Sequence, residues 1–290
     1  VLWVFMTIAD PFLGRISYAK VITGTVKVGQ ELYNSRTEKM EKLGSMFFVR
    51  GKHQIPATEV VAGDIFALAK LAGTKTGDTL SLRSEGIKFD AVYTGYLGST
   101  KQIDYVKDIM DSVLLDNGLR IVDPAMADNG SLYYGFDDEF VAAMAKLCGS
   151  ADIILPNITE ACFMTGCEYK EVYDKAYIDE LLDKLSEICP NTVVLTGVGY
   201  DEDHTGVIVK EPTGVSYYEH KRIKGGTHGT GDVYASAFTG ALIRGKSVYD
   251  AAKIAADYTL ACIENTIDDE NHWYGVHFEG MLGKLIDALR

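Results

Sequence analysis

The last two thirds of the chain alternate short apolar runs with helical patterns, and this alternation limits the fold more than any other feature. Four runs read as strands, at residues 89–94, 120–123, 152–155 and 192–196. Helices are expected at 100–115, 137–148, 157–164, 175–188, 230–244, 247–265 and 276–289, with a β-hairpin near 205–222. Such alternation predicts an α/β fold, a parallel sheet with helices on both faces. Ligands of such sheets bind beyond the carboxyl ends of the strands.

The first part of the chain has a different pattern and reads as all-β. Short runs of strand formers separated by turn residues are expected to be strands at 2–8, 15–22, 27–33, 42–48, 62–68 and 76–80. Several short strands in succession predict a small closed β-barrel. Charge changes at the same point, because residues 1–85 carry a net charge of +3 and residues 86–290 carry −16. We therefore expect two domains, at residues 1–83 and 84–290.

The overall composition excludes several classes of protein. The net charge of −13 argues against nucleic-acid binding by the whole chain. No apolar run is long enough to span a membrane, and the N-terminus has no secretory signal pattern. The five cysteines are odd in number and lack Cys-x-x-Cys spacing, which fits free thiols in a reducing compartment. A cytoplasmic protein is expected.

A glycine-rich turn runs directly into the helical pattern that begins at residue 230. Four glycines fall between Gly225 and Gly231, and Asp232 lies in the first helical turn. Free backbone N–H groups and the positive end of a helix dipole make such a turn an anion site, usually for phosphate. Asp232 could equally be a simple N-terminal cap. No lysine follows the glycines, so this is not a P-loop, and a bound phosphate would need a cation from elsewhere.

Polar residues follow three of the expected strands. Asp123 ends one strand, Asn157 and Glu160 follow the next, and Thr196 ends a third. Each has a structural alternative, since Asp123 could cap a strand end and the Asn157–Glu160 pair resembles a helix capping box. Together they place Asp123 and Glu160 at the same sheet edge as the glycine turn. Two carboxylates there could hold Mg²⁺, which would bridge nucleotide phosphates.

Residues 1–83 resemble domain 2 of elongation factor G and its relatives. The motifs that carry the resemblance are Asp10-Pro11-Phe12-Leu13-Gly14-Arg15, Val21-Ile22-Thr23-Gly24, Val61-Ala62-Gly63-Asp64-Ile65 and Thr76-Gly77-Asp78-Thr79-Leu80. The resemblance implies a β-barrel that packs beside a GTPase domain and touches ribosomal RNA. The chain has no P-loop and no Asn-Lys-x-Asp, so it is not a GTPase. Its small positive charge favours a barrel that is only an extension over one that binds ribosomal RNA.

Residues 86–290 resemble the pyridoxal (pyridoxine, pyridoxamine) kinases of the ribokinase-like superfamily. The motifs are Thr94-Gly95-Tyr96, Asp123-Pro124, Leu155-Pro156-Asn157-x-x-Glu160 and Gly229-Thr230-Gly231-Asp232. The resemblance implies ATP- and Mg²⁺-dependent phosphorylation of the primary hydroxyl of a B6 vitamer. It also implies a homodimer and use of a monovalent cation.

The same resemblance implies a role for each candidate site residue. Asp232 would be the general base, and the anion hole would consist of Gly229, Thr230 and Gly231. Magnesium would be organised by Asn157 and Glu160. ATP would be bound by Asp123, Asp128 and Thr196, beneath a mobile flap at 126–135. Tyr96 would contact the pyridine ring, and His228 would touch phosphate or serve structure.

The chain departs from the kinase pattern before residue 87. Kinases of this family have a further N-terminal segment that supplies the first strands and part of the vitamin pocket, and here the barrel stands in its place. The sequence therefore reads as a chimera joined near 82–87, with an N-terminally truncated kinase domain, an exposed sheet edge and impaired vitamin binding. Two alternatives remain: a kinase of another hydroxylated molecule (hydroxymethylpyrimidine, sugar or nucleoside), and a non-catalytic chimera with a ribosome-contacting barrel.

Overall fold

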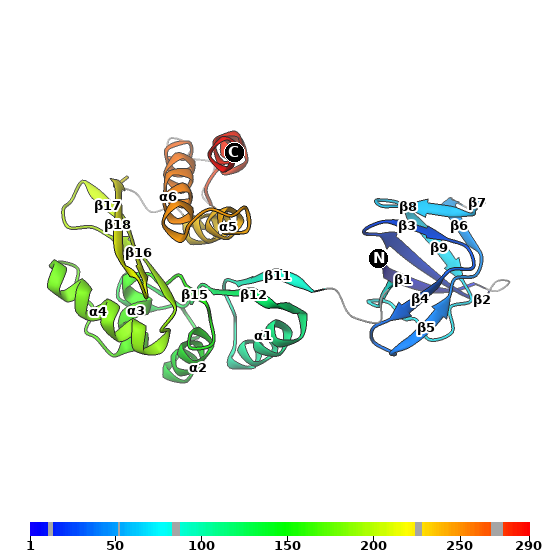
Figure 1. Ribbon diagram of the computed structural model, residues 1–290, viewed down its shortest axis with the longest axis horizontal. Coiled ribbons are helices and arrows are strands. Elements are labelled where there is room, and N and C mark those ends of the chain that lie inside the picture. Colours follow the sequence, from blue (N-terminus) through cyan, green and yellow to red (C-terminus); the bar gives the residue numbers. More distant parts are fainter. Residues whose placement is uncertain (11–13, 52, 83–87, 224–227, 268–274) are drawn as a thin grey trace. The chain divides into compact units, whose positions relative to one another are not determined.

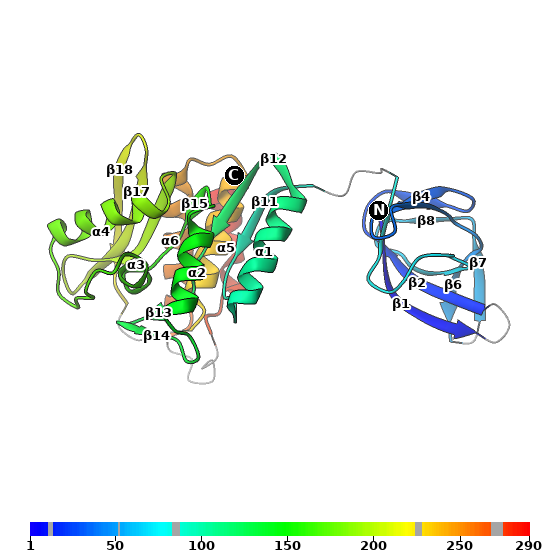
Figure 2. The ribbon, with the colours of Figure 1, turned by 90° about the horizontal axis from the view of Figure 1, so that it is seen from below.

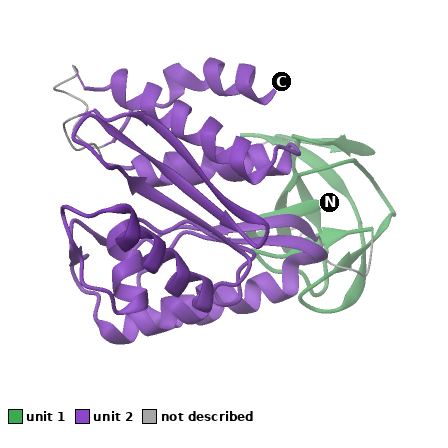
Figure 3. Ribbon diagram, turned by 60° about the vertical axis from the view of Figure 1, so that its left-hand side comes forward, with its two compact units in different colours: residues 1–87 green, residues 88–290 purple. Residues whose placement is uncertain are grey.

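The computed structural model divides the chain into two compact units, Val1–Ile87 and Lys88–Arg290 (Figure 3). It describes all residues except 11–13, 52, 83–87, 224–227 and 268–274. The expected join at 82–87 therefore lies mostly outside the described residues. The same is true of the middle of the first barrel motif, Pro11 to Leu13, and of the first two glycines of the turn, Gly225 and Gly226. Each unit is described by itself.

The first unit is an antiparallel β structure that curls around its own apolar core (Figures 1 and 2). Eight strands pair in the order β5-β4-β10-β1-β2-β9-β6-β7, and β3 pairs with β8. Their bounds are β1 Leu2–Asp10, β2 Gly14–Val21, β3 Thr25–Lys27, β4 Glu31–Asn34, β5 Lys39–Lys42, β6 Met46–Arg50, β7 His53–Ala57, β8 Glu59–Val61, β9 Ile65–Ala69 and β10 Thr79–Ser81. Fully buried side chains such as Leu2, Leu32 and Phe66 fill the interior.

Two predicted strands of this unit were each too long. The run at 27–33 breaks into β3 and β4 because Gly29 adopts a left-handed φ of 80° and turns the chain. The run at 42–48 divides between β5, which ends at Lys42, and β6, which begins at Met46. The strands β7 and β8 were not predicted, because most of their side chains are exposed and no apolar alternation marks them.

The second unit is built on a six-stranded sheet in the order β11-β12-β15-β16-β17-β18. The first four strands are parallel and the last two form an antiparallel hairpin. Their bounds are β11 Phe89–Thr94, β12 Leu114–Val122, β15 Ile153–Ile154, β16 Thr192–Val198, β17 His204–Glu211 and β18 Gly214–Lys221. A small separate hairpin consists of β13 Ala127–Asp128 and β14 Ser131–Leu132.

Helices cover both faces of this sheet, which confirms the predicted α/β fold (Figure 1). One face carries α1 Thr100–Val113, α2 Asp138–Cys148, α3 Ile158–Thr165 and α4 Lys175–Ile188. The other carries α5 Thr230–Ile243, α6 Val248–Glu264, the short 3₁₀ helix Glu279–Met281 and α7 Leu282–Leu289. The sheet alternates between the two cores, since Val193 and Leu195 face the first and Val194 faces the second.

Two element bounds in this unit differ from prediction. β12 begins at Leu114, directly after α1, and not at residue 120. The predicted helix at 276–289 is regular only from Leu282, because the preceding turn is a 3₁₀ helix and its glycine, Gly280, is a weak helix former. Among the described residues, no helix is long and apolar enough to cross a membrane.

Candidate active site

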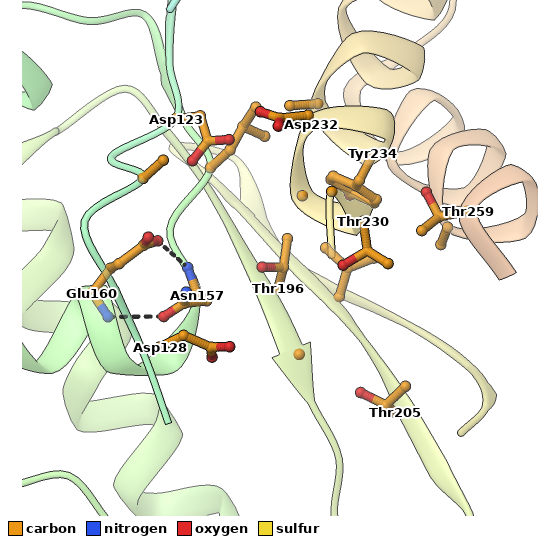
Figure 4. A pocket seen from close by; sticks show the side chains of 18 of the residues that line it. Asp123, Asp128, Asn157, Glu160, Thr196, Thr205, Thr230, Asp232, Tyr234 and Thr259 are labelled. Atoms are coloured by element: carbon orange, nitrogen blue, oxygen red, sulfur yellow. Dashed lines mark hydrogen bonds between the residues drawn. The ribbon is translucent and has the colours of Figure 1, made fainter. Parts of the chain in front are cut away.

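A cavity of about 620 Å³ lies at the carboxyl ends of the parallel strands (Figure 4). Ten residues singled out from the sequence all line it: Tyr96, Asp123, Asp128, Asn157, Glu160, Thr196, Gly229, Thr230, Gly231 and Asp232. Parallel strands bring these positions together from β11, β12, β15, β16 and the start of α5, although they are spread over 137 positions of the sequence. The structure places them in one cavity, and their individual roles stay predictions.

The N-terminus of α5 forms one wall of the cavity. Gly229 is the N-cap with a left-handed φ of 79°, and no side chain of the described residues caps the helix. Asp232 lies in the first turn and is exposed, so the alternative that it serves as the N-terminal cap is wrong. The free amides of this turn and the carboxylate of Asp232 therefore border the same space.

The opposite wall is the N-terminus of α3, where Asn157 and Glu160 form a complete capping box (Figure 4). The Glu160 amide donates to Asn157 Oδ1 at 2.9 Å, and the Asn157 amide donates to Glu160 Oε2 at 2.8 Å. Glu160 Oε1 also accepts from the Met126 amide at 3.1 Å, and Asn157 Nδ2 donates to the Ala127 carbonyl at 2.8 Å. The structural alternative for this pair is thus confirmed, and any contact with a metal must use the remaining lone pairs of Glu160.

Two carboxylates in the cavity are buried without a compensating charge. Asp123 is 8% exposed and Glu160 is 3% exposed, and neither forms an ion pair with a Lys or Arg among the described residues. Burial, with the nearby charge of Asp232, raises the pKa of Asp123 to about 7. Burial, with the charge of Asp123, raises the pKa of Glu160 well above its usual value. The site as a whole therefore favours binding of a cation.

The donor atoms fit magnesium. Mg²⁺ binds oxygen ligands, commonly one or two carboxylates together with water and substrate phosphates. Glu160 and Asp123 supply such oxygens inside the cavity, and Asp128 supplies another from its exposed rim. Asn157 fits less well as a ligand because both ends of its side-chain amide are already hydrogen-bonded.

Aromatic side chains form part of the cavity rim and were largely missed from the sequence. Tyr96 is 59% exposed and its ring lies 5.5 Å from that of Phe136. Tyr133, whose pKa is raised to about 12 by burial and by the Glu160 charge, also lines the cavity. Tyr93, at the end of β11, contacts Asp123 through its hydroxyl at 3.5 Å. In the sequence, the only sign that Tyr93 lies near the site is its position beside the Thr94-Gly95-Tyr96 motif.

Away from Asp123 and Glu160, the cavity lining is a mixture of apolar and polar side chains. Its apolar part includes Val207 from β17, Ala235 from α5, and Ala256 and Leu260 from α6, and its polar part includes Thr205, His220 and Thr259. A phosphate-binding helix N-terminus beside an apolar pocket suits a ligand that carries both a phosphate chain and a flat ring system. A nucleoside triphosphate is such a ligand.

A parallel sheet, a helix N-terminus for phosphate and facing carboxylates define a phosphotransferase that acts on an alcohol group. Comparison with known proteins agrees, and more narrowly the chain belongs to the phosphomethylpyrimidine kinase family, whose sequence model matches residues 55–277.

Solved structures similar to this chain include kinases from two bacteria. A phosphomethylpyrimidine kinase from Bacteroides thetaiotaomicron, in a crystal form with pyridoxal, is 35% identical over 69% of this chain and 72% of its own, with a TM-score of 0.64. Its rhombohedral form gives 33% identity, 69% and 70% coverage, and a TM-score of 0.65. Pyridoxal kinase from Lactobacillus plantarum is 30% identical, with 69% and 72% coverage and a TM-score of 0.63.

The N-terminal unit matches a different family. The sequence model for elongation factor G domain 2 covers residues 2–82, which confirms the resemblance of this part. The two family matches overlap at residues 55–82, and the structure decides the overlap, because β7 to β10 pair with the other strands of the first unit.

Proposed function

We propose that the chain catalyses ATP- and Mg²⁺-dependent phosphorylation of the primary hydroxyl of pyridoxal, pyridoxine or pyridoxamine. The observation that carries the proposal is the exposed Asp232 carboxylate in the first turn of α5, in one cavity with the buried Asp123 and Glu160. The pyridoxal-containing Bacteroides structure and the Lactobacillus pyridoxal kinase support the choice of substrate.

In this mechanism the amides of Gly229, Thr230 and Gly231 bind the phosphoryl group that is transferred. Asp232 accepts the proton of the substrate alcohol as its oxygen attacks, which is general-base help worth roughly 10² to 10⁴ in rate. Glu160 and Asp123 would hold magnesium, which would supply positive charge against the phosphates. Asp128 and Thr196 position the nucleotide, and Tyr96 lies against the pyridine ring.

A second candidate substrate is hydroxymethylpyrimidine. The family match carries its name, and the Bacteroides relative bears the same description. Both substrates are flat nitrogen heterocycles with a primary alcohol, so the same base and anion site serve either. No feature of the described residues favours a sugar or a nucleoside.

The test is a coupled assay of ADP release with ATP and Mg²⁺, run with each B6 vitamer and with hydroxymethylpyrimidine. We expect turnover of at least one vitamer that disappears when Mg²⁺ is chelated. Faster turnover of hydroxymethylpyrimidine would replace the first substrate with the second. A chain that binds Mg·ATP in calorimetry but phosphorylates none of these would refute the substrate proposal, and a chain that binds no nucleotide would refute the enzyme.

We also propose the wider organisation that the resemblances imply. Residues 1–83 act as a non-catalytic extension, and residues 84–290 act as a kinase domain that lacks the family's N-terminal part and is less active for that reason. The kinase forms a homodimer, uses a monovalent cation and works in the cytoplasm, where its five free cysteines stay reduced. Light scattering measures the mass of the particle and so tests the dimer. Activity after replacement of K⁺ by choline tests the need for a monovalent cation. Cosedimentation with ribosomes tests the alternative role of the barrel in binding ribosomal RNA.

A further inference from the structure

Tyr93 is the last side chain of β11 before the Thr94-Gly95-Tyr96 segment, and its hydroxyl reaches the acidic end of the cavity. Its ring packs against the apolar core beneath α5 and α6. Its hydroxyl oxygen lies 3.5 Å from Asp123 Oδ2. A phenylalanine would fill the same core space, so the hydroxyl is the part of this side chain that packing does not explain.

Gly95 shows how close this hydroxyl lies to the proposed general base. A Cβ atom at Gly95 would be 3.2 Å from the Tyr93 hydroxyl and 3.5 Å from Asp232 Oδ1. The phenol and the Asp232 carboxylate therefore both border the space in front of Gly95.

This placement has an electrostatic consequence. Burial and the charges of Asp123 and Asp232 hold the pKa of Tyr93 above its usual range, so the phenol keeps its proton. A protonated phenol can donate one hydrogen bond, and an O–H···O⁻ bond is usually 2.5–2.7 Å long. At 3.5 Å the contact with Asp123 is longer than such a bond.

We propose that Tyr93 is a positioning residue of the phosphoryl-transfer centre: its hydroxyl holds the Asp123 carboxylate in place by a hydrogen bond. The inference rests on the proposed kinase function. Asp123 is buried, and a hydrogen bond from a neutral donor limits the side-chain conformations that its carboxylate can adopt. Without it, Asp123 loses a hydrogen-bond donor among the described residues.

The first test is Tyr93→Phe, which removes one oxygen and keeps the ring. We expect kcat to fall on the order of tenfold with KM for the vitamer unchanged, as for other residues that act through a neighbouring group. The affinity for Mg·ATP, measured by calorimetry without turnover, should fall several-fold. Tyr258→Phe is the matched control, because its hydroxyl donates to the Phe278 carbonyl at 2.8 Å in the same core but away from this cavity.

The proposal would be overturned if Tyr93→Phe and Tyr258→Phe had the same kcat, the same KM and the same affinity for Mg·ATP. An inactive wild-type chain would refute the proposed function instead, and the calorimetric comparison would still decide whether Tyr93 orients Asp123. An equal drop in the melting temperature of Tyr93→Phe and Tyr258→Phe would show that both variants remain folded and that each loses the stability of one hydrogen bond.

The second test is a double-mutant cycle with Gly95→Ala. The added methyl group meets the Tyr93 hydroxyl at 3.2 Å, and in the Tyr93→Phe background that oxygen is gone. The cost of Gly95→Ala in kcat and in melting temperature should therefore be smaller in the Tyr93→Phe background than in the wild type. Strictly additive effects in both measurements would show that the hydroxyl does not occupy the space between Gly95 and Asp232, and the proposal would fail.

Discussion

Each unit buries carboxylates, and the two units treat them in opposite ways. In the first unit, Asp78 accepts from Arg36 Nε at 2.6 Å, from Asn34 Nδ2 at 2.8 Å and from the Lys75 amide at 2.9 Å. The guanidinium lowers the pKa of Asp78 to about 2. In the second unit, burial raises the pKa of Asp123 to about 7, and the one hydrogen bond of its carboxylate among the described residues is the long contact with Tyr93.

The difference separates a structural carboxylate from one that awaits a ligand. A buried charge is tolerated when the protein itself supplies the partner, as Arg36 does for Asp78. Glu41 in the first unit has no such cation within the part of the chain that the structure describes and accepts from the amides of Ala72 and Gly73 and the hydroxyl of Thr74, much as Glu160 accepts from two amides. Asp123 and Glu160 have no protein cation among the described residues, so the missing charge is expected to arrive with magnesium and nucleotide.

The comparison depends most on the proposed base. Asp232→Asn should lower kcat by roughly 10² to 10⁴, because the amide cannot accept the proton of the alcohol. Steady-state kinetics with the best vitamer measure this. Asp250→Asn is the control, since Asp250 lies in the first turn of the neighbouring helix α6 and outside the cavity. Equal activity of both variants would remove Asp232 from the reaction.

A substitution at Glu160 tests whether this capping residue also binds the metal. Glu160→Gln keeps an acceptor for the Asn157 amide but removes the charge, so we expect the Mg²⁺ concentration at half-maximal activity to rise about 10- to 100-fold. Glu41→Gln in the first unit is the matched control, because it changes a buried, amide-bound glutamate far along the chain from the cavity. An unchanged Mg²⁺ dependence would reduce Glu160 to its structural role.

The raised pKa of Asp123 predicts a gain in stability on its removal. The native state binds this proton more tightly than the unfolded chain, whose carboxyl has a pKa near 3.8, so stability falls as pH rises from about 4 to about 7. Asp123→Asn should abolish that loss and raise the unfolding midpoint of the second unit by a few degrees at pH 8, while activity falls. Calorimetric scans at pH 5 and pH 8 give the difference. If Asp123→Asn were less stable than the wild type at pH 8, the charge of Asp123 would not be uncompensated in the native state.

Asp78 should show the opposite dependence on pH. Its native pKa of about 2 lies below the usual 3.8, so its contribution is fully present above about pH 4 and is lost as pH falls toward 2. Because Arg36 is partly exposed, we expect the contribution to be about 1–2 kcal/mol. Acid unfolding of wild type and Asp78→Asn should converge near pH 2. A constant gap down to that pH would mean that Asp78 acts through packing alone.

The sequence was sufficient to predict which residues share the cavity. Asp123, Glu160 and Thr196 each follow a strand of one parallel sheet, and such strands end at one edge whatever the details of packing. That rule needs only the order of the elements. It therefore predicted the placement of these residues, although not what each of them does.

The rest depended on three-dimensional packing that periodicity does not encode. Tyr93 looks like an ordinary strand residue, since tyrosine is common in half-buried strands, and its contact with Asp123 arises only when β11 pairs with β12. The exposed strands β7 and β8 carry no apolar alternation because they cover only part of the first core. Gly29 breaks a run of strand formers by its backbone conformation alone.

The capping box at α3 has a further consequence. Through Oε1 and Oε2, Glu160 holds the Met126 amide and the Asn157 amide, while Asn157 holds the Ala127 carbonyl and Thr159 Oγ1 accepts from the Gly130 amide. One carboxylate thus joins the start of a helix to the β13–β14 hairpin beside the cavity. A cation bound through the remaining lone pairs of Glu160 would share these oxygens with the Met126 and Asn157 amides, so we expect amide exchange at Met126 to change when the site is filled.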